Sequence, residues 1–219
     1  MKALLVALFL CVSLGVASAQ AGKTASAQKS SAGARKAPPV AGRSECVAAV
    51  GLCVTVPASW HRLGDVFDDL GFVVAEPHAG VDSAAWPQLT VAAIDVPLEK
   101  DANGVVVAQS LDAIVDIVLT PDGSFASTET LQRTHLMLNG CEAEIVRVRL
   151  RDEKSEAIEA IALIDGEDGL VYSIALRSAA QDVARLEPIF DKAIHSWRIE
   201  PAMAQPALQS KPGQDSEKK

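Results

Sequence analysis

Hydrophobic and polar residues alternate over several short stretches of this chain, with the two-residue period that is typical of β-strands. The first clear stretch is Leu52 to Val56, which ends at the turn-forming sequence Pro57-Ala58-Ser59. Seven such stretches predict an α+β protein built on a mostly antiparallel sheet of about six to seven strands. The other six stretches are 71–75, 88–96, 131–138, 142–150, 157–164 and 170–177.

The sequence Asn139-Gly140 lies between two predicted strands and indicates a two-residue hairpin turn. A type I′ turn needs positive φ at both central positions, and Asn-Gly tolerates this best. Residues 165–169 are expected to join the last two strands. The first turn also fixes a register for its strands. The predicted cross-strand pairs are Leu138 with Cys141, Leu136 with Ala143, Thr134 with Ile145, His135 with Glu144, and Leu131 with Val148.

Two other stretches have the 3.6-residue period of amphipathic helices. The first helix is expected to begin after Ser110, a favourable N-cap, and to end at Thr120-Pro121. In the second helix, Pro188 is placed in the first turn, where a missing backbone N–H costs little. Each helix should pack on a face of the sheet through its apolar stripe. The stripes are Leu111, Ile114, Val115 and Val118 in the first helix, and Leu186, Ile189, Phe190, Ala193, Ile194 and Trp197 in the second.

Residues 1–19 have the three parts of a removable secretory signal peptide. Lys2 supplies a positive charge, residues 3–16 are apolar, and Ala17-Ser18-Ala19 is a small-residue cleavage site. We therefore expect cleavage after Ala19 and a periplasmic or secreted protein. The apolar run is shorter than the roughly 20 residues that a membrane-spanning helix needs, so the protein is not expected to span a membrane.

One domain is expected at residues 45–200, between a disordered linker at 20–44 and a disordered tail at 201–219. Both ends are rich in Ala, Ser, Lys, Pro and Gln. Such segments cannot bury enough apolar surface to offset the entropy of ordering them. Residues 44–200 carry 26 acidic and 11 basic side chains, a formal net charge of −15. Because an acidic domain repels phosphate backbones, nucleic acid is not an expected partner.

Three cysteines remain after the predicted cleavage: Cys46, Cys53 and Cys141. In an oxidising compartment an odd number indicates one disulfide and one thiol, or a bridge between molecules. A local disulfide between Cys46 and Cys53 is the favoured pairing, because the residues between them are few enough to form a turn. A bridge from either of them to Cys141 stays an alternative. The spacing of the three fits no zinc site, and we assign no metal ligands.

The chain contains no nucleophile elbow, P-loop or H-E-x-x-H sequence. Its histidines are scattered, and its acidic clusters do not follow the calcium-loop pattern. We therefore assign no catalytic or cofactor-binding residues, and we expect no cofactor. If the protein were a hydrolase or a metal-dependent enzyme, the locus to consider would be His61 with Asp65, Asp68 and Asp69.

Three stretches suggest a relationship to a known group of proteins. Residues 51–60 form a strand that ends in Pro-x-x-Trp, residues 139–143 read Asn-Gly-Cys-Glu-Ala, and residues 190–198 form a closing helix that ends in Ser-Trp-Arg. In these stretches, and in the order of its elements, the chain resembles the PsbP-like superfamily, to which exported bacterial DcrB-like proteins belong. The resemblance implies a sheet with helices on its faces and a non-enzymatic role, and it carries over no site.

The sequence therefore predicts an exported, non-enzymatic binding or accessory module of the cell envelope. Its partner would be an envelope protein or a small ligand that contacts the sheet or its edge. Two alternatives stay open. One is an enzyme with a site near His61, and the other is a structural envelope protein whose basic ends contact anionic polymers.

Overall fold

The computed structural model describes residues 41–78, 86–96, 99–100, 106–107, 109–119, 127–151, 155–166 and 169–201. The predicted signal peptide with its cleavage site, residues 20–40 of the predicted linker and residues 202–219 of the predicted tail lie outside these ranges. In the described part of the chain, no helix has both the length and the apolar character that crossing a membrane requires.

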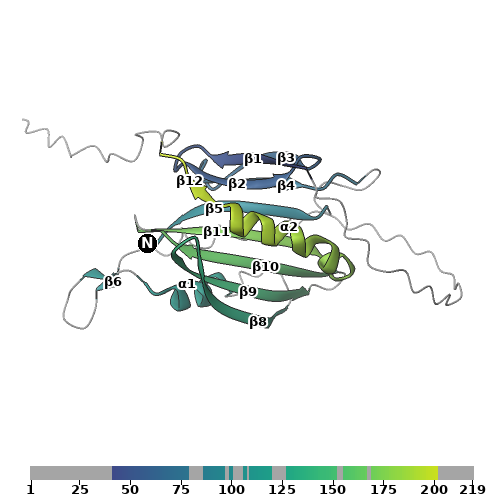
Figure 1. Cartoon of the computed structure of the whole chain (residues 1–219). Helices are drawn as coiled ribbons and strands as arrows, with labels where there is room; N and C mark the ends of the chain where they lie inside the picture. The colour runs from purple at the N-terminus through teal and green to yellow at the C-terminus, as the bar shows by residue number, and fades with distance from the viewer. Residues whose placement is uncertain are drawn as a thin grey trace, which may run out of the picture.

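A seven-stranded antiparallel sheet forms the centre of the fold (Figure 1). Its strand order is β3-β4-β5-β11-β10-β9-β8, and every pair of neighbours is antiparallel. The predicted α+β class with a mostly antiparallel sheet is confirmed. The strands are β3 (His61–Val66), β4 (Gly71–Ala75), β5 (Gln88–Asp95), β8 (Ser127–Leu138), β9 (Cys141–Arg151), β10 (Glu156–Asp165) and β11 (Leu170–Ala179).

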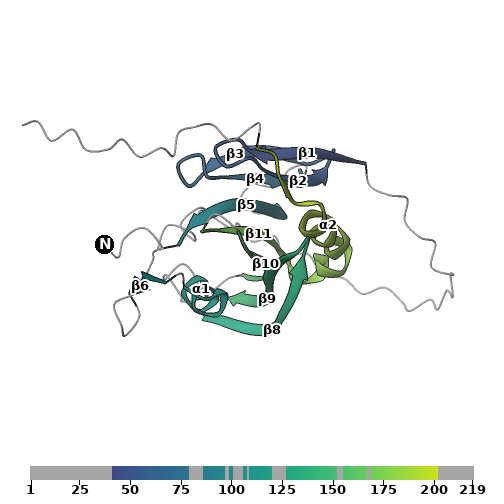
Figure 2. The ribbon, with the colours of Figure 1, turned by 60° about the vertical axis from the view of Figure 1, so that its left-hand side comes forward.

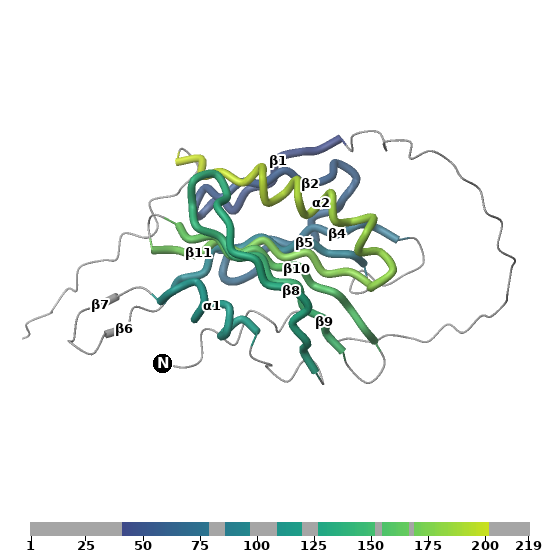
Figure 3. Tube along the Cα trace, turned by 60° about the horizontal axis from the view of Figure 1, so that its bottom comes forward, coloured from purple at the N-terminus to yellow at the C-terminus, as the bar shows by residue number. Residues whose placement is uncertain are grey.

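A smaller sheet, with strand order β1-β2-β12, lies on the same side of the main sheet as the C-terminal helix (Figure 3). Its first strand begins at Gly42, three residues before the predicted start of the domain, because the backbone there pairs with β2. The remaining short strands pair only with each other. The bounds are β1 (Gly42–Val47), β2 (Leu52–Pro57), β12 (Arg198–Ile199), β6 (Glu99–Lys100) and β7 (Val106–Val107).

The β8–β9 hairpin has the predicted turn, with φ of +52° at Asn139 and +90° at Gly140. The four predicted pairs nearest this turn are present. The fifth prediction is wrong, because the register shifts at Leu131 and Thr130 lies opposite Val148 instead. A β-bulge of this kind adds one residue to one strand, which turn chemistry alone does not reveal.

The two helices lie on opposite faces of the main sheet (Figure 2). Helix α1 (Leu111–Val118) begins as predicted, with the Ser110 hydroxyl accepting a hydrogen bond from the Ala113 N–H at 3.3 Å. Its predicted apolar stripe is buried. The N-cap and the periodicity together therefore defined this element correctly.

Helix α2 (Val183–Ser196) follows a 3₁₀ turn at Ala180–Asp182. Pro188 thus lies inside the helix, and its predicted place in the first turn is wrong. Proline cannot donate to the carbonyl four residues earlier, which belongs to Ala184. Both residues are exposed, so water can solvate that carbonyl and the helix can continue through the proline.

Two hydrophobic cores lie on the two faces of the main sheet. The larger core is enclosed by the main sheet, the small sheet and α2, and it contains Trp60, Phe72, Phe190 and Trp197. The smaller core lies under α1. Its residues are Ile94, Val96, Leu111, Ile114, Val115, Val118, Val146, Val148, Leu150, Ile161, Leu163 and Val171.

Candidate functional site

Helix α1 covers only part of its face of the main sheet. It has eight residues, which corresponds to about 12 Å in length, and it contacts β9 and β10. Seven strands spaced by about 4.8 Å span roughly 29 Å, so one short helix cannot cover them all. Beside α1, over β4, β5, β11 and β10, lies a cavity of about 260 Å³.

Small side chains form the floor of this cavity. The strand register places Thr90 of β5 opposite Ala175 of β11, and Ala92 opposite Ser173. These four side chains stand on the same face of the sheet, and their small size leaves the space above them unfilled. The whole floor consists of Val73, Thr90, Ala92, Ile161, Ser173 and Ala175.

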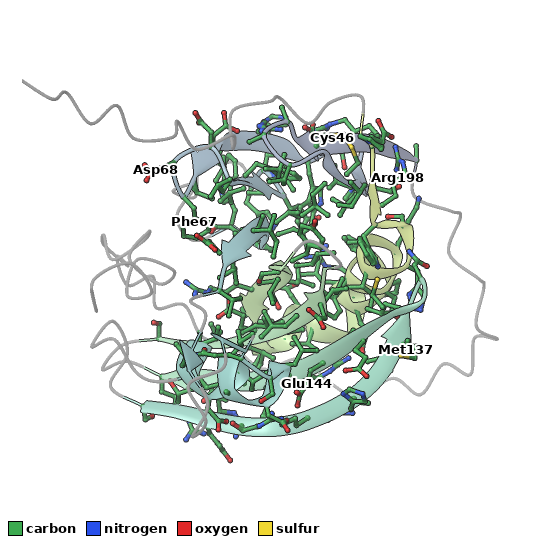
Figure 4. The ribbon with its side chains drawn as sticks, turned by 90° about the vertical axis from the view of Figure 1, so that its left-hand side faces the viewer. Cys46, Phe67, Asp68, Met137, Glu144 and Arg198 are labelled. Carbon is green, nitrogen blue, oxygen red and sulfur yellow. A yellow bond between two sulfur atoms is a disulfide. The ribbon has the colours of Figure 1, made fainter. Side chains whose placement is uncertain are left out.

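The rim of the cavity is formed by residues 63–67, from β3 and the turn after it, and by Val118 of α1. Leu63 is 42% exposed, so this apolar rim is accessible from solvent. Figure 4 shows Phe67 on the side of the main sheet that carries α1, whereas Asp68 lies at the outside of the domain. The rim therefore presents mostly apolar side chains, with the Asp65 carboxylate among them, to a molecule that enters.

One end of the cavity is polar. Gln88, Arg177 and Glu159 lie directly opposite one another on the adjacent strands β5, β11 and β10. Arg177 Nη2 donates to a Glu159 carboxylate oxygen at 3.2 Å. Gln88 and Glu159 are 9% and 7% exposed, which is unusual for such residue types. A buried charge pair of this kind is costly to desolvate, and hydrophobic residues of similar volume often replace it without loss of stability.

The turn between β3 and β4 has an uncommon backbone. Phe67, Asp68 and Asp69 have φ of 56°, 52° and 69°, and left-handed backbone costs about 1 kcal/mol at each residue other than glycine. Gly71 follows this turn. A Cβ at Gly71 would lie 2.8 Å from the Val91 carbonyl oxygen and 3.0 Å from the Phe67 ring. The glycine therefore allows the Phe67 ring to lie against β4 at the rim of the cavity.

The size and the lining of the cavity suit a small, mostly apolar molecule. An apolar protein cavity of about 150 Å³ is large enough to hold benzene. Ligand sites are commonly apolar concavities with a few polar groups that orient the ligand. This cavity has the same arrangement, because its polar row lies at one end and its floor and rim elsewhere are mostly apolar.

No protein-family model and no curated protein matches the chain. Cyanobacterial PsbP (CyanoP) from Synechocystis is similar in structure, with a TM-score of 0.55 and 12% identity over 78% of this chain and 99% of that chain. The chain has the PsbP-like fold. The yeast Ran-binding protein Mog1p is also similar, with a TM-score of 0.53 and 11% identity over 75% of this chain and 98% of that chain.

The residues considered for an enzyme do not converge in this PsbP-like fold. His61 is exposed at the start of β3, opposite Ala75. Asp65 lies near the other end of the strand, where it accepts a hydrogen bond from Arg62. Asp68 and Asp69 are exposed in the left-handed turn. Of the four residues, only Asp65 lines the cavity.

The structure joins Cys46 to Cys53 in a disulfide, the pairing that the sequence favoured. Cys141 is partly buried and is not part of this disulfide. Among the described residues, the one group of three possible metal ligands within 4.8 Å consists of Cys46, Cys53 and Glu200. Because the two sulfur atoms are bonded to each other, they are not thiolate ligands.

His135 does lie opposite Glu144, as predicted. Glu144 is buried, and its carboxylate accepts hydrogen bonds from Arg133. Arg133 also contacts Asp112 and Asp116 of α1. These ion pairs therefore connect α1 to β8 and β9 of the main sheet. Glu167 and Asp168, in the acidic connection expected at residues 165–169, lie outside the described residues.

The polar row of the cavity was not predicted from the sequence. Gln88 and Arg177 are end residues of predicted strands, and Glu159 is the single polar residue of a third, otherwise apolar one. One feature of the sequence could have indicated the row: in each strand, the polar residue lies on the same face as residues at apolar positions. Their convergence depends on the spatial order β5-β11-β10, which brings together segments far apart in the chain.

Proposed function

We propose that this protein is an exported, non-enzymatic binding module that holds a small, mostly apolar molecule in the cavity beside α1. One observation carries the proposal: a cavity of about 260 Å³ with a mostly apolar floor and rim has a polar row at one end, in which Gln88 and Glu159 are buried. A structure optimised for stability alone would fill this space, since interiors are normally packed to crystal-like density.

Two further findings support a binding role and export. A structurally similar protein, Mog1p, is described as Ran-binding, so this fold can serve in recognition. The Cys46–Cys53 disulfide is typical of proteins that leave the reducing cytosol. Together with the predicted signal peptide, the disulfide favours a periplasmic or secreted location.

The proposal is tested by titrating octanamide into the mature, isotope-labelled protein and following backbone amide resonances by NMR. We expect saturable shifts for residues on β5, β10 and β11, and smaller shifts in the small sheet. Ala175→Phe would place a large ring on the floor and should abolish binding. Thr134→Phe, at an exposed position on β8, is the matched control and should bind normally. If neither the parent nor the control binds octanamide, the proposal is wrong.

A further inference from the structure

We infer that the cavity selects molecules with an uncharged hydrogen-bonding head, such as a primary amide, over carboxylates and amines. This selectivity presupposes the proposed ligand-binding function and adds to it the chemical class of the ligand. It follows from the three side chains at the polar end, Gln88, Arg177 and Glu159, and from the bonds between them.

The two charges at the polar end already neutralise each other. The Arg177 guanidinium donates to both Glu159 carboxylate oxygens, at 3.2 and 3.4 Å. Their side chains are 26% and 9% exposed, so water screens the pair only partly. The polar end therefore has no formal net charge, and an ionic head would enter it without a counter-charge of its own.

Each ionic head would also meet a side chain of its own sign. A carboxylate that approached Arg177 would lie beside the Glu159 carboxylate, and an ammonium that approached Glu159 would lie beside the guanidinium. Like charges brought together in a site shielded from water are strongly disfavoured. Asp65 on the rim and the net charge of −15 over residues 44–200 disfavour anions further.

An uncharged amide on the ligand matches the hydrogen-bonding groups at the polar end of the cavity. A carboxylate only accepts hydrogen bonds, a guanidinium only donates them, and the Gln88 amide can do both. A primary amide on the ligand could therefore donate to Glu159 and accept from Arg177 without breaking their charge balance. Its hydrocarbon body would then lie against the apolar floor and the Phe67 rim.

Three probes with the same eight-carbon body test this selectivity: octanamide, octanoate and octylamine. At pH 7 the second is an anion and the third a cation, because their pKa values resemble those of Glu and Lys side chains. Isothermal titration calorimetry on the mature protein should show octanamide binding about tenfold more tightly than either ionic probe. Similar affinities for all three would overturn the selectivity but leave the proposed function intact. Binding of none would contradict both.

Glu159→Gln provides a sharper test, because it removes the carboxylate that balances the charge of Arg177. The preference should then reverse, with octanoate binding more tightly than octanamide. Glu187→Gln is the matched control, since Glu187 pairs with Arg147 away from this cavity, and it should keep the parent ranking. An unchanged ranking in a folded Glu159→Gln protein would overturn the proposed role of the polar row. If this variant does not fold, the parent affinities decide the question.

Discussion

At the scale of single residues, two glycines differ in whether their backbone conformation favours glycine over other residues. At both Gly140 and Gly64, an added Cβ would meet nothing within 4 Å. Gly140, however, has φ of +90° in the hairpin turn, whereas Gly64 lies in the bulged part of β3 without a positive φ. Because an added Cβ has space at both positions, the comparison isolates the conformational strain at Gly140.

We expect Gly140→Ala to lower the free energy of unfolding by about 1 kcal/mol, because alanine is strained at positive φ. Gly64→Ala should be neutral or slightly stabilising, since alanine reduces the entropy of the unfolded chain without strain in the fold. Urea denaturation of both variants measures the difference. Equal effects at the two positions would contradict a strained turn at Asn139-Gly140.

At the scale of secondary-structure elements, α1 depends on its N-cap. An isolated helix of eight residues is unstable in water, so its termini and its packing must stabilise it. Ser110→Ala removes the hydroxyl that accepts from the Ala113 N–H, and it should cost about 1 kcal/mol of stability. Ser110→Asp keeps an acceptor and should cost much less. The comparison is made by thermal and urea denaturation, and equal losses would exclude capping as the cause.

The ion pair between Glu76, which follows β4, and Arg185 of α2 predicts a dependence of stability on pH. Arg185 donates to both oxygens of Glu76 at 2.8 Å, and this lowers the pKa of Glu76 below its usual value of 4.5. A carboxyl with a lowered pKa stabilises the fold above pH 4.5, and this contribution is lost as the pH falls through the lowered value.

Glu76→Gln should therefore destabilise the protein by about 0.5–1 kcal/mol at pH 7. The difference from the parent should shrink below pH 4.5, because a protonated carboxyl resembles the amide. Urea denaturation between pH 7 and pH 3 gives both curves. Glu142→Gln, at an exposed position on β9, serves as the control. A destabilisation by Glu76→Gln that stays constant with pH would rule out this ion pair as its source.

Elements with many buried apolar residues were predictable from the sequence. Helix α1 and β9 bury a regular stripe, whereas β5, β10 and β11 are buried along most of their length, and the predictions placed all five within two residues of the observed bounds. β3 was missed because its residues are mostly exposed, which leaves no alternation to detect. The first three residues of β1 were assigned to the linker, because the composition there does not reveal their pairing with β2. The bulge at Leu131 and the cavity depend on pairing between distant segments.

At the scale of the whole molecule, the main sheet separates two regions. The small sheet, with the Cys46–Cys53 disulfide, packs with α2 on one face. The cavity lies on the other face beside α1. Stabilisation of the first region and ligand binding in the second should therefore be separable.

Reduction of the disulfide tests this separation. The bridge closes a loop with a sequence separation of seven residues, and chain entropy predicts a loss of about 2.5 kcal/mol when such a short loop is opened. We expect dithiothreitol to lower the midpoint of urea denaturation while leaving the octanamide affinity of the folded protein unchanged. Because Cys141 is not part of the disulfide, Cys141→Ser should respond to reduction as the parent does. The Cys46→Ala/Cys53→Ala double variant should not respond. A parallel fall in stability and affinity would show that the two faces are coupled through the strands they share.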